Sequence, residues 1–85
     1  MKKYTIKEFN SEHGTNHKSW YEISKYQTLS EQFIEKHADI VDWDYISAHQ
    51  KLSETFIEKY SDKMNWYDIS QYQKLSEQFI EELVS

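Results

Sequence analysis

Large apolar side chains recur along this chain at a fixed interval. Trp20, Trp43 and Trp66 are spaced 23 residues apart, and the segments 20–42, 43–65 and 66–85 share the pattern W-x-x-I-S-x-x-Q-x-L-S-E-x-F-I-E without a gap. Self-similarity at a short fixed period is the signature of repeat proteins, in which each unit buries its apolar face against its neighbours. The sequence therefore predicts three stacked repeats with these bounds.

Each repeat is expected to contain two short helices. The residues before the tryptophans are Ser19, Asp42 and Asn65, and all three are strong helix N-cap types. In the second half, the serine of L-S-E is a further N-cap candidate, and the leucine before it and the isoleucine four residues after it have the spacing of a hydrophobic staple. No proline or glycine separates the two halves, so one continuous helix per repeat stays open as the alternative.

The segment 5–19 is expected to cap the first repeat. Thr5 and Glu8 have capping-box spacing, Ile6 and Phe9 are apolar, and Gly14 is a favourable residue just beyond a helix end. We predict a capping helix over residues 5–13. The last repeat differs from the others at residues 83–84, as expected of the end of a stack. The predicted fold is all-α: a short helical-repeat stack of helical hairpins, resembling an α-solenoid, with an N-terminal capping helix, in one domain of residues 1–85.

The predicted core consists of the shared apolar residues. In the first repeat these are Trp20, Ile23, Leu29, Phe33 and Ile34, and their equivalents lie 23 and 46 residues further on. Trp20 and Ile23 are three apart, so they share one face of the first helix.

Composition narrows the classes of function. The chain has no cysteine, which excludes disulfides and thiolate metal sites. Its formal net charge is −5 and it has no arginine, the residue most used to read bases and phosphates, so no direct nucleic-acid binding is expected. No stretch approaches the roughly 20 apolar residues of a membrane span, and no apolar run follows the charged start. We therefore expect a cytoplasmic protein that does not bind a membrane.

The polar residues shared by the repeats are interpreted as structural. Serines at 24, 47 and 70 and glutamines at 27, 50 and 73 lie near the predicted buried face, where they can bind backbone groups left unpaired at helix ends. His13 and His17 have the spacing of two zinc ligands on one helix, but Gly14 interrupts them and a polar loop is the preferred interpretation. We expect no metal, no cofactor and no catalysis, because no nucleophile–base pair or phosphate loop is recognisable.

Two sets of residues are candidates for binding a partner. Tyr21, Tyr45 and Tyr67 lie just off the predicted buried face, where exposed tyrosine is favoured in interfaces, although aromatic packing between repeats is an equal alternative. Paired glutamates on the second helices would align as an acidic ridge when repeats stack. A solvated face explains the first of each pair, which the helix N-terminal dipole favours, better than the second. The pairs are Glu31 and Glu35, Glu54 and Glu58, and Glu77 and Glu81.

The pattern W-x-x-I-S-x-x-Q-x-L-S-E-x-F-I, over residues 20–85, resembles a short helical repeat of viral and bacterial proteins whose function is uncharacterised. The resemblance implies the repeat architecture and transfers no functional site. In its small size and acidic charge, though not in any motif, the chain also resembles phage-encoded inhibitors of bacterial defence such as anti-CRISPR proteins. We expect a non-enzymatic protein-binding module that occludes a partner with a basic surface, as an inhibitor encoded by a phage or mobile element. The alternative is a structural or self-assembling repeat protein that forms homodimers.

Overall fold

The fold is helical throughout the part of the chain that is described. A computed structural model describes residues 3–84, and side chains as far as Glu82, so residues 1–2 and 85 and the side-chain differences at 83–84 lie outside it. The regular elements of residues 3–84 are α1 (Ile6–His13), α2 (Trp20–Tyr26), α3 (Glu31–Lys36), α4 (Trp43–His49), α5 (Glu54–Lys59), α6 (Trp66–Tyr72) and α7 (Glu77–Val84). The predicted all-α repeat stack with a capping helix is confirmed.

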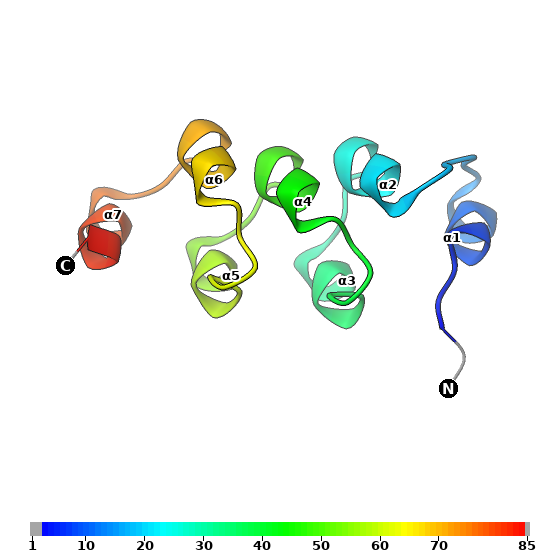
Figure 1. Cartoon of the computed structure of the whole chain (residues 1–85), viewed down its shortest axis with the longest axis horizontal. Helices are drawn as coiled ribbons and strands as arrows, with labels where there is room; N and C mark the ends of the chain where they lie inside the picture. Colours follow the sequence, from blue (N-terminus) through cyan, green and yellow to red (C-terminus); the bar gives the residue numbers. More distant parts are fainter. Residues whose placement is uncertain (1–2, 85) are drawn as a thin grey trace.

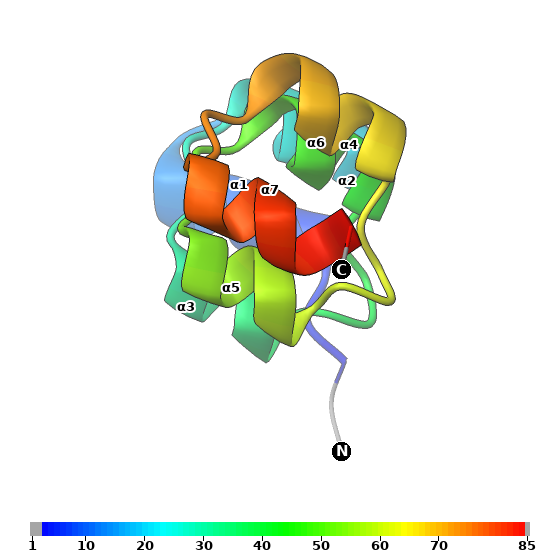
Figure 2. The same ribbon diagram turned by 90° about the vertical axis from the view of Figure 1, so that its left-hand side faces the viewer.

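The helices form consecutive hairpins that stack along one axis. Each repeat supplies a pair, α2 with α3, α4 with α5 and α6 with α7. The first helices form one layer, in which α2 packs on α4 and α4 on α6, while α3 and α5 lie in a second layer below it (Figure 1). Seen along the stack, α2, α4 and α6 lie above α3 and α5, and α7 lies at a height between the two layers (Figure 2). The molecule is accordingly elongated, with extents of 44 × 26 × 16 Å.

Side-chain caps fix where the helices begin. The Ser19 and Asn65 side chains accept hydrogen bonds from backbone nitrogens in the first turns of α2 and α6, and Asp42 does the same for α4. Ser30 and Ser53 cap α3 and α5 in the same way. These N-caps were all predicted, because a hydroxyl, amide or carboxylate at this position satisfies an amide group that the helix leaves unpaired.

The first helix of each repeat ends at the shared glutamine. Gln27, Gln50 and Gln73 have extended backbones, with ψ of 141 to 143°, so the continuous-helix alternative is wrong. Local sequence offers no helix breaker at this point. The serine side chain after each loop accepts a hydrogen bond from the first turn of the second helix in all three repeats, which favours a new helix start there. In the first two repeats the extended loop is also held by a side chain of the following repeat, as described below.

The core centres on isoleucine rather than tryptophan. Ile23, Ile46 and Ile69 are fully buried on the first helices, as are Ile34 and Ile57 on the second helices. The predicted burial of the tryptophans needs correction, because Trp20 and Trp43 are only partly buried and Trp66 is 37% exposed. Indole N–H groups need a hydrogen-bond acceptor, and those of Trp43 and Trp66 donate to the backbone oxygens of Ala38 and Ser61, which places both rings at the rim.

Ile80 is a second correction to the predicted core. Its side chain is 46% exposed, whereas the equivalent Ile34 and Ile57 are fully buried. Ile34 and Ile57 both belong to repeats that another repeat follows. Within residues 3–84 no further repeat lies against α7, so the same residue type at the same position stays partly in solvent.

The capping helix closes the other end of the stack. Phe9 is fully buried, with its ring centroid 5.7 Å from that of Phe33 and 6.1 Å from that of Trp20. α1 ends at Gly14, whose φ of 65° is a left-handed conformation that suits glycine. Thr5 is the N-cap, so the helix begins at Ile6, one residue after the predicted start.

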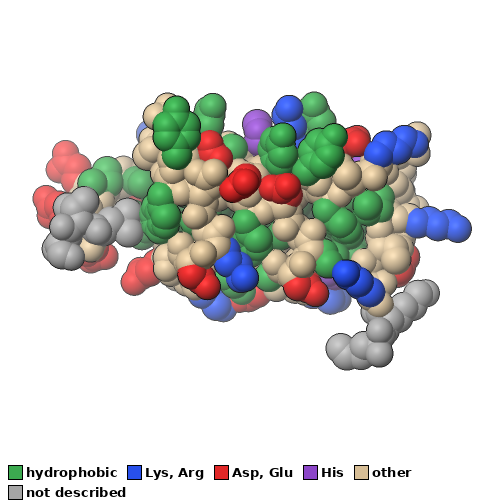
Figure 3. Space-filling view, in the orientation of Figure 1, with side chains coloured by type: hydrophobic (Ala, Val, Ile, Leu, Met, Phe, Trp, Pro, Cys, Tyr) green, Lys and Arg blue, Asp and Glu red, His purple; other side chains and the backbone are tan. Residues whose placement is uncertain are grey.

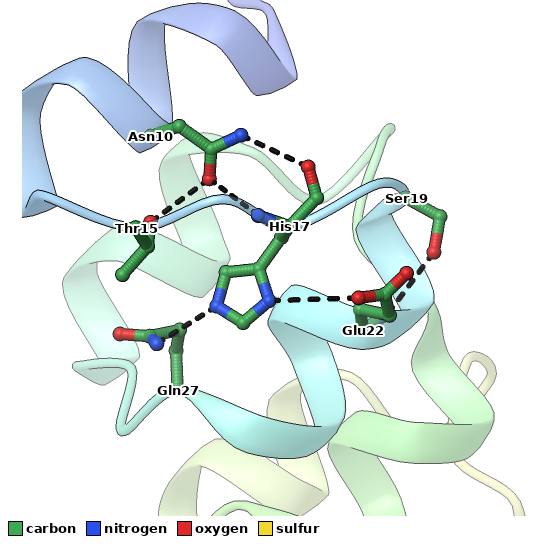
Figure 4. A network of polar contacts seen from close by, with 6 residues as sticks. All are labelled: Asn10, Thr15, His17, Ser19, Glu22 and Gln27. Atoms are coloured by element: carbon green, nitrogen blue, oxygen red, sulfur yellow. Dashed lines mark hydrogen bonds and ion pairs between the residues drawn. The ribbon is translucent and has the colours of Figure 1, made fainter.

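A polar network joins this cap to the first repeat (Figure 4). The Asn10 side chain binds the backbone nitrogen and oxygen of His17, at 2.9 Å each, and accepts a hydrogen bond from the Thr15 hydroxyl. The His17 ring in turn lies with Nε2 2.8 Å from Gln27 Nε2 and Nδ1 3.8 Å from a Glu22 carboxylate oxygen. The loop after α1 is thereby positioned against α2.

Candidate partner-binding surface

The shared glutamines connect one repeat to the one before it. Gln50 is 4% exposed; its Nε2 donates to the backbone oxygens of Ser24 and Gln27, at 2.7 and 2.6 Å, and its Oε1 accepts from Leu29 N at 2.8 Å. Gln73 makes the equivalent three bonds to the second repeat. These contacts confirm that Gln50 and Gln73 satisfy backbone groups, which removes them from the candidates for binding or chemistry. The side chain of Gln27 instead lies against the His17 ring.

The shared serines have a similar structural role in the first two repeats. Ser24 and Ser47 are fully buried, and their hydroxyls accept hydrogen bonds from the backbone nitrogens of Asp42 and Asn65. Ser70 is exposed and donates instead to Tyr67 O within its own helix. The structural interpretation is therefore confirmed for two of the three serines.

Two glutamates of the predicted acidic ridge also connect repeats. The Glu31 carboxylate accepts hydrogen bonds from Ser53 N at 2.6 Å and from its hydroxyl at 3.0 Å. Glu54 binds Ser76 in the same way, at 2.5 and 3.0 Å. Each carboxylate thus lies at the N-terminus of the next repeat's second helix, where negative charge is favoured. This arrangement gives both glutamates a role in holding the stack together.

Glu35 is engaged as well, although it is exposed. Its carboxylate binds the Lys59 ammonium group and accepts a hydrogen bond from the Tyr60 hydroxyl at 2.8 Å. The hydrogen bond from Lys59, then that from Tyr60, hold the pKa of Glu35 below its ordinary value. The interaction joins α3 to α5.

The remaining acids of the ridge are oriented to solvent. Glu58, on α5, and Glu77 and Glu81, on α7, are all exposed. All six predicted glutamates therefore lie on the second helices, as expected. The described contacts divide them into three that connect repeats, Glu31, Glu35 and Glu54, and three that are exposed to solvent.

The predicted tyrosines lie on the layer of first helices. Tyr21 is 47% exposed, Tyr67 is 73% exposed and Tyr45 is partly buried. The rings of Tyr21 and Tyr45 lie 5.6 Å apart, which brings α2 and α4 into contact at the surface. Tyr67, on α6, makes no ring contact with another described residue. The structure thus brings two of the three together.

Further aromatic side chains extend this surface beyond the predicted set. Tyr45 stacks on His49 at 5.7 Å, and His49 stacks on Tyr72 at 6.5 Å, across the junction of α4 and α6. Tyr26 and Tyr72 are 65% and 66% exposed. The spacing of Tyr45 and His49 by four residues on one helix was the available signal, since such residues share a face. We call the set Tyr21, Tyr26, Tyr45, His49, Tyr67 and Tyr72 the aromatic surface.

The aromatic surface runs along the layer of first helices. Figure 3 shows hydrophobic, histidine and lysine side chains gathered along the edge that carries α2, α4 and α6. Exposed hydrophobic side chains that are contiguous, rather than scattered, are characteristic of interaction sites. The arrangement offers contact area and hydrogen-bonding hydroxyl groups to a partner.

The other histidines pack within the fold. The His13 ring stacks on Phe9 at 4.0 Å, and its Nδ1 lies 2.9 Å from Phe9 O. His37 stacks on Tyr4 at 4.4 Å, and burial, with a smaller effect of Lys36, lowers its pKa. Burial and a hydrogen bond to Glu12 raise the pKa of Tyr4 to about 12. In the portion of the chain described, no three metal-ligating side chains are grouped to hold an ion.

Comparison with protein-family models, curated proteins and solved structures gives no match for this chain. The resemblance of its repeat to a 23-residue helical family therefore stays a prediction. No helix in residues 3–84 is both long and apolar enough to cross a bilayer.

Proposed function

We propose that this chain is a non-enzymatic protein-binding module that acts by occluding part of a protein partner. The observation that carries the proposal is the aromatic surface, in which Tyr21, Tyr45, His49 and Tyr72 form a continuous row across three repeats. Tyrosine buries a large area at a small cost in side-chain entropy, and it is enriched among the residues that dominate binding energy.

Charge supports a partner with a basic surface. The net charge is −5, and Glu58, Glu77 and Glu81 are exposed on the second helices. An acidic surface accelerates association with a basic one and disfavours contact with nucleic acid. The narrower form of the proposal is an inhibitor encoded by a phage or mobile element, of the anti-CRISPR kind, which covers a basic surface of a host defence protein.

The proposal is tested by comparing variants of the full chain as bait in an extract of the native host. We expect one stoichiometric partner to bind the wild type. Its affinity should fall about tenfold or more in Tyr21→Ala/Tyr67→Ala, because tyrosine is enriched among the interface residues whose truncation costs over about 1 kcal/mol. The matched control is Gln32→Ala, an exposed residue on the second layer, which should bind normally.

The role of the acids is tested separately. Charge reversal in Glu58→Lys/Glu81→Lys should weaken binding and reduce its salt dependence without a change in melting temperature, since neither carboxylate connects repeats. Glu35 is left intact because it binds Lys59. A partner that is retained equally by the tyrosine variant and the wild type would refute the role of the aromatic surface.

A second candidate function is supported by the exposed end of the stack. Ile80 and Trp66 are 46% and 37% exposed, whereas the equivalent isoleucines are fully buried and the equivalent tryptophans partly buried. A structural or self-assembling protein would cover this end with a second copy. Light scattering over a concentration series distinguishes the two functions, because a homodimer dissociates on dilution and should be lost in Ile80→Glu.

A further inference from the structure

The two junctions between first helices have equivalent positions but different chemistry. At the junction of α2 and α4, Tyr21 and Lys25 lie against Tyr45. At the junction of α4 and α6, the residues 23 positions further on take these places: Asp44, Ala48 and Asp68. Two tyrosines are thus replaced by aspartates, and a lysine by alanine.

The first junction is filled by its own side chains. The rings of Tyr21 and Tyr45 are in contact, and the Lys25 ammonium group lies 5.8 Å from the centroid of Tyr45 and 5.2 Å from that of Tyr26. A cation within about 6 Å of an aromatic ring face is attracted by the negative face of the ring. This junction therefore already holds a cationic side chain.

The second junction is an open groove of about 370 Å³. Asp44 and Asp68 line it from α4 and α6, and His49 and Tyr72 lie beside them with their rings stacked. Ala48 is too short to occupy the space that the Lys25 side chain fills one repeat earlier. Asn65 Nδ2 donates to Asp44 Oδ1 at 3.1 Å, which leaves the second oxygen of that carboxylate for a ligand.

We propose that the groove between α4 and α6 binds a lysine side chain of the partner protein. The ammonium group would lie between the carboxylates of Asp44 and Asp68, and its aliphatic stem against Tyr72 and His49. The inference rests on the proposed function, because it specifies the chemistry of the partner's contact with the aromatic surface. It is carried by Lys25, which holds the equivalent position at the first junction.

A lysine fits this groove better than a metal ion does. In the described residues no three ligating side chains are close enough to bind a metal, and Asn65 already binds one oxygen of Asp44. An ammonium group needs no fixed coordination shell, and its charge is opposite to that of the two carboxylates that line the groove. The aromatic rings supply contacts for the stem that an ion cannot use.

The test is a titration of isotope-labelled full-length protein with a pentalysine peptide at low salt, followed by NMR. We expect saturable shifts at the backbone amides of Asp44, His49, Asp68 and Tyr72, larger than those at Glu58 and Glu81. Ala48→Lys places a lysine where Lys25 lies in the first repeat, so it should abolish these shifts while leaving the fold intact. Asp68→Asn, which keeps the shape of the side chain, should weaken binding about threefold.

Two results would overturn the proposal. One is an equal response of Ala48→Lys and wild type to the peptide, and the other is a set of shifts spread over the acids of α5 and α7 without any at α4 and α6. Lys25→Ala is the matched control, since it changes the same type of position at the other junction and should leave the α4–α6 shifts unchanged.

The partner assay separates failure of the groove from failure of the function. If Ala48→Lys binds the native partner as tightly as wild type while Tyr21→Ala/Tyr67→Ala does not, the groove proposal fails and the binding function stands. If pentalysine binds the groove but no partner depends on the tyrosines, the proposed function fails and cation recognition stands.

Discussion

The side chain of Gln50 holds the backbone of Leu29 in the preceding repeat, with Gln50 Oε1 2.8 Å from Leu29 N. The same amide donates to two backbone oxygens of that loop, so one buried side chain satisfies three backbone groups. The extended loop between α2 and α3 thus depends on a residue 21 positions further along the chain.

Replacing Gln50 should therefore destabilise the whole stack. We expect Gln50→Ala to lower the free energy of unfolding by about 2–3 kcal/mol, because buried donors and acceptors lose their partners. Urea denaturation gives this value. Gln32→Ala, at an exposed position, is the control, and a similar midpoint for the two variants would contradict the role assigned to Gln50.

Equivalent isoleucines should differ in their contribution to stability. Ile57 is fully buried and Ile80 is 46% exposed. We expect Ile57→Ala to cost about 2–5 kcal/mol through lost burial and a cavity, and Ile80→Ala to cost under about 1 kcal/mol. Thermal and urea unfolding of the two single variants measure the difference. Equal losses would show that α7 is covered in solution.

Glu31 and Glu77 have the same position in the first and last repeats, so their variants form a matched pair. Glu31 binds the backbone nitrogen and hydroxyl of Ser53, whereas Glu77 has the same position in the last repeat and no such serine beyond it in residues 3–84. Glu31→Ala should cost about 1 kcal/mol, the size of a lost helix cap, and Glu77→Ala clearly less. Chemical denaturation measures both losses of stability. A larger loss in Glu77→Ala than in Glu31→Ala would exclude the capping role of Glu31.

Stability should fall as the solution is acidified. Burial lowers the pKa of His37 below its usual 6.5, so below this pH the unfolded chain binds more protons than the folded chain does. The contribution of His37 is fully present above pH 6.5 and is lost as the pH falls through the lower folded pKa. Glu35, whose pKa is also lowered, adds a loss in the same direction at more acidic pH.

The variant His37→Tyr isolates the histidine contribution, because Tyr60 is the equivalent residue in the second repeat. Melting temperatures at about pH 8 and about pH 5 should differ less in this variant than in wild type. The other histidines are common to both proteins. An identical pH dependence of the melting temperature in His37→Tyr and wild type would show that other residues cause the acid sensitivity.

Features set by local chemistry could be predicted from the sequence, and those set by neighbouring repeats could not. The caps at Ser19 and Ser30 and the helix end at Gly14 depend on a few adjacent residues, and all were predicted correctly. The exposure of Ile80 depends on whether a repeat follows, which no pattern within its own helix can indicate.

The candidate site shows the same division. The exposed positions of Tyr21 and Tyr67 followed from their place beside the buried face. The use of Glu31 as a link to Ser53 was missed, because the two residues are 22 positions apart and meet only through the register of stacking. The signal was present in the sequence, since both residue types recur in every repeat.

The residues that recur in every repeat and those that vary between repeats have different roles, and this has an evolutionary consequence. Gln50 and Glu31 hold the stack, whereas the residues at 44, 48 and 68 can differ from their counterparts at 21, 25 and 45 without touching those links. Mutation in the layer of first helices can therefore change which partner the molecule binds while the contacts between repeats are preserved. Duplication of a repeat would lengthen the surface available for binding.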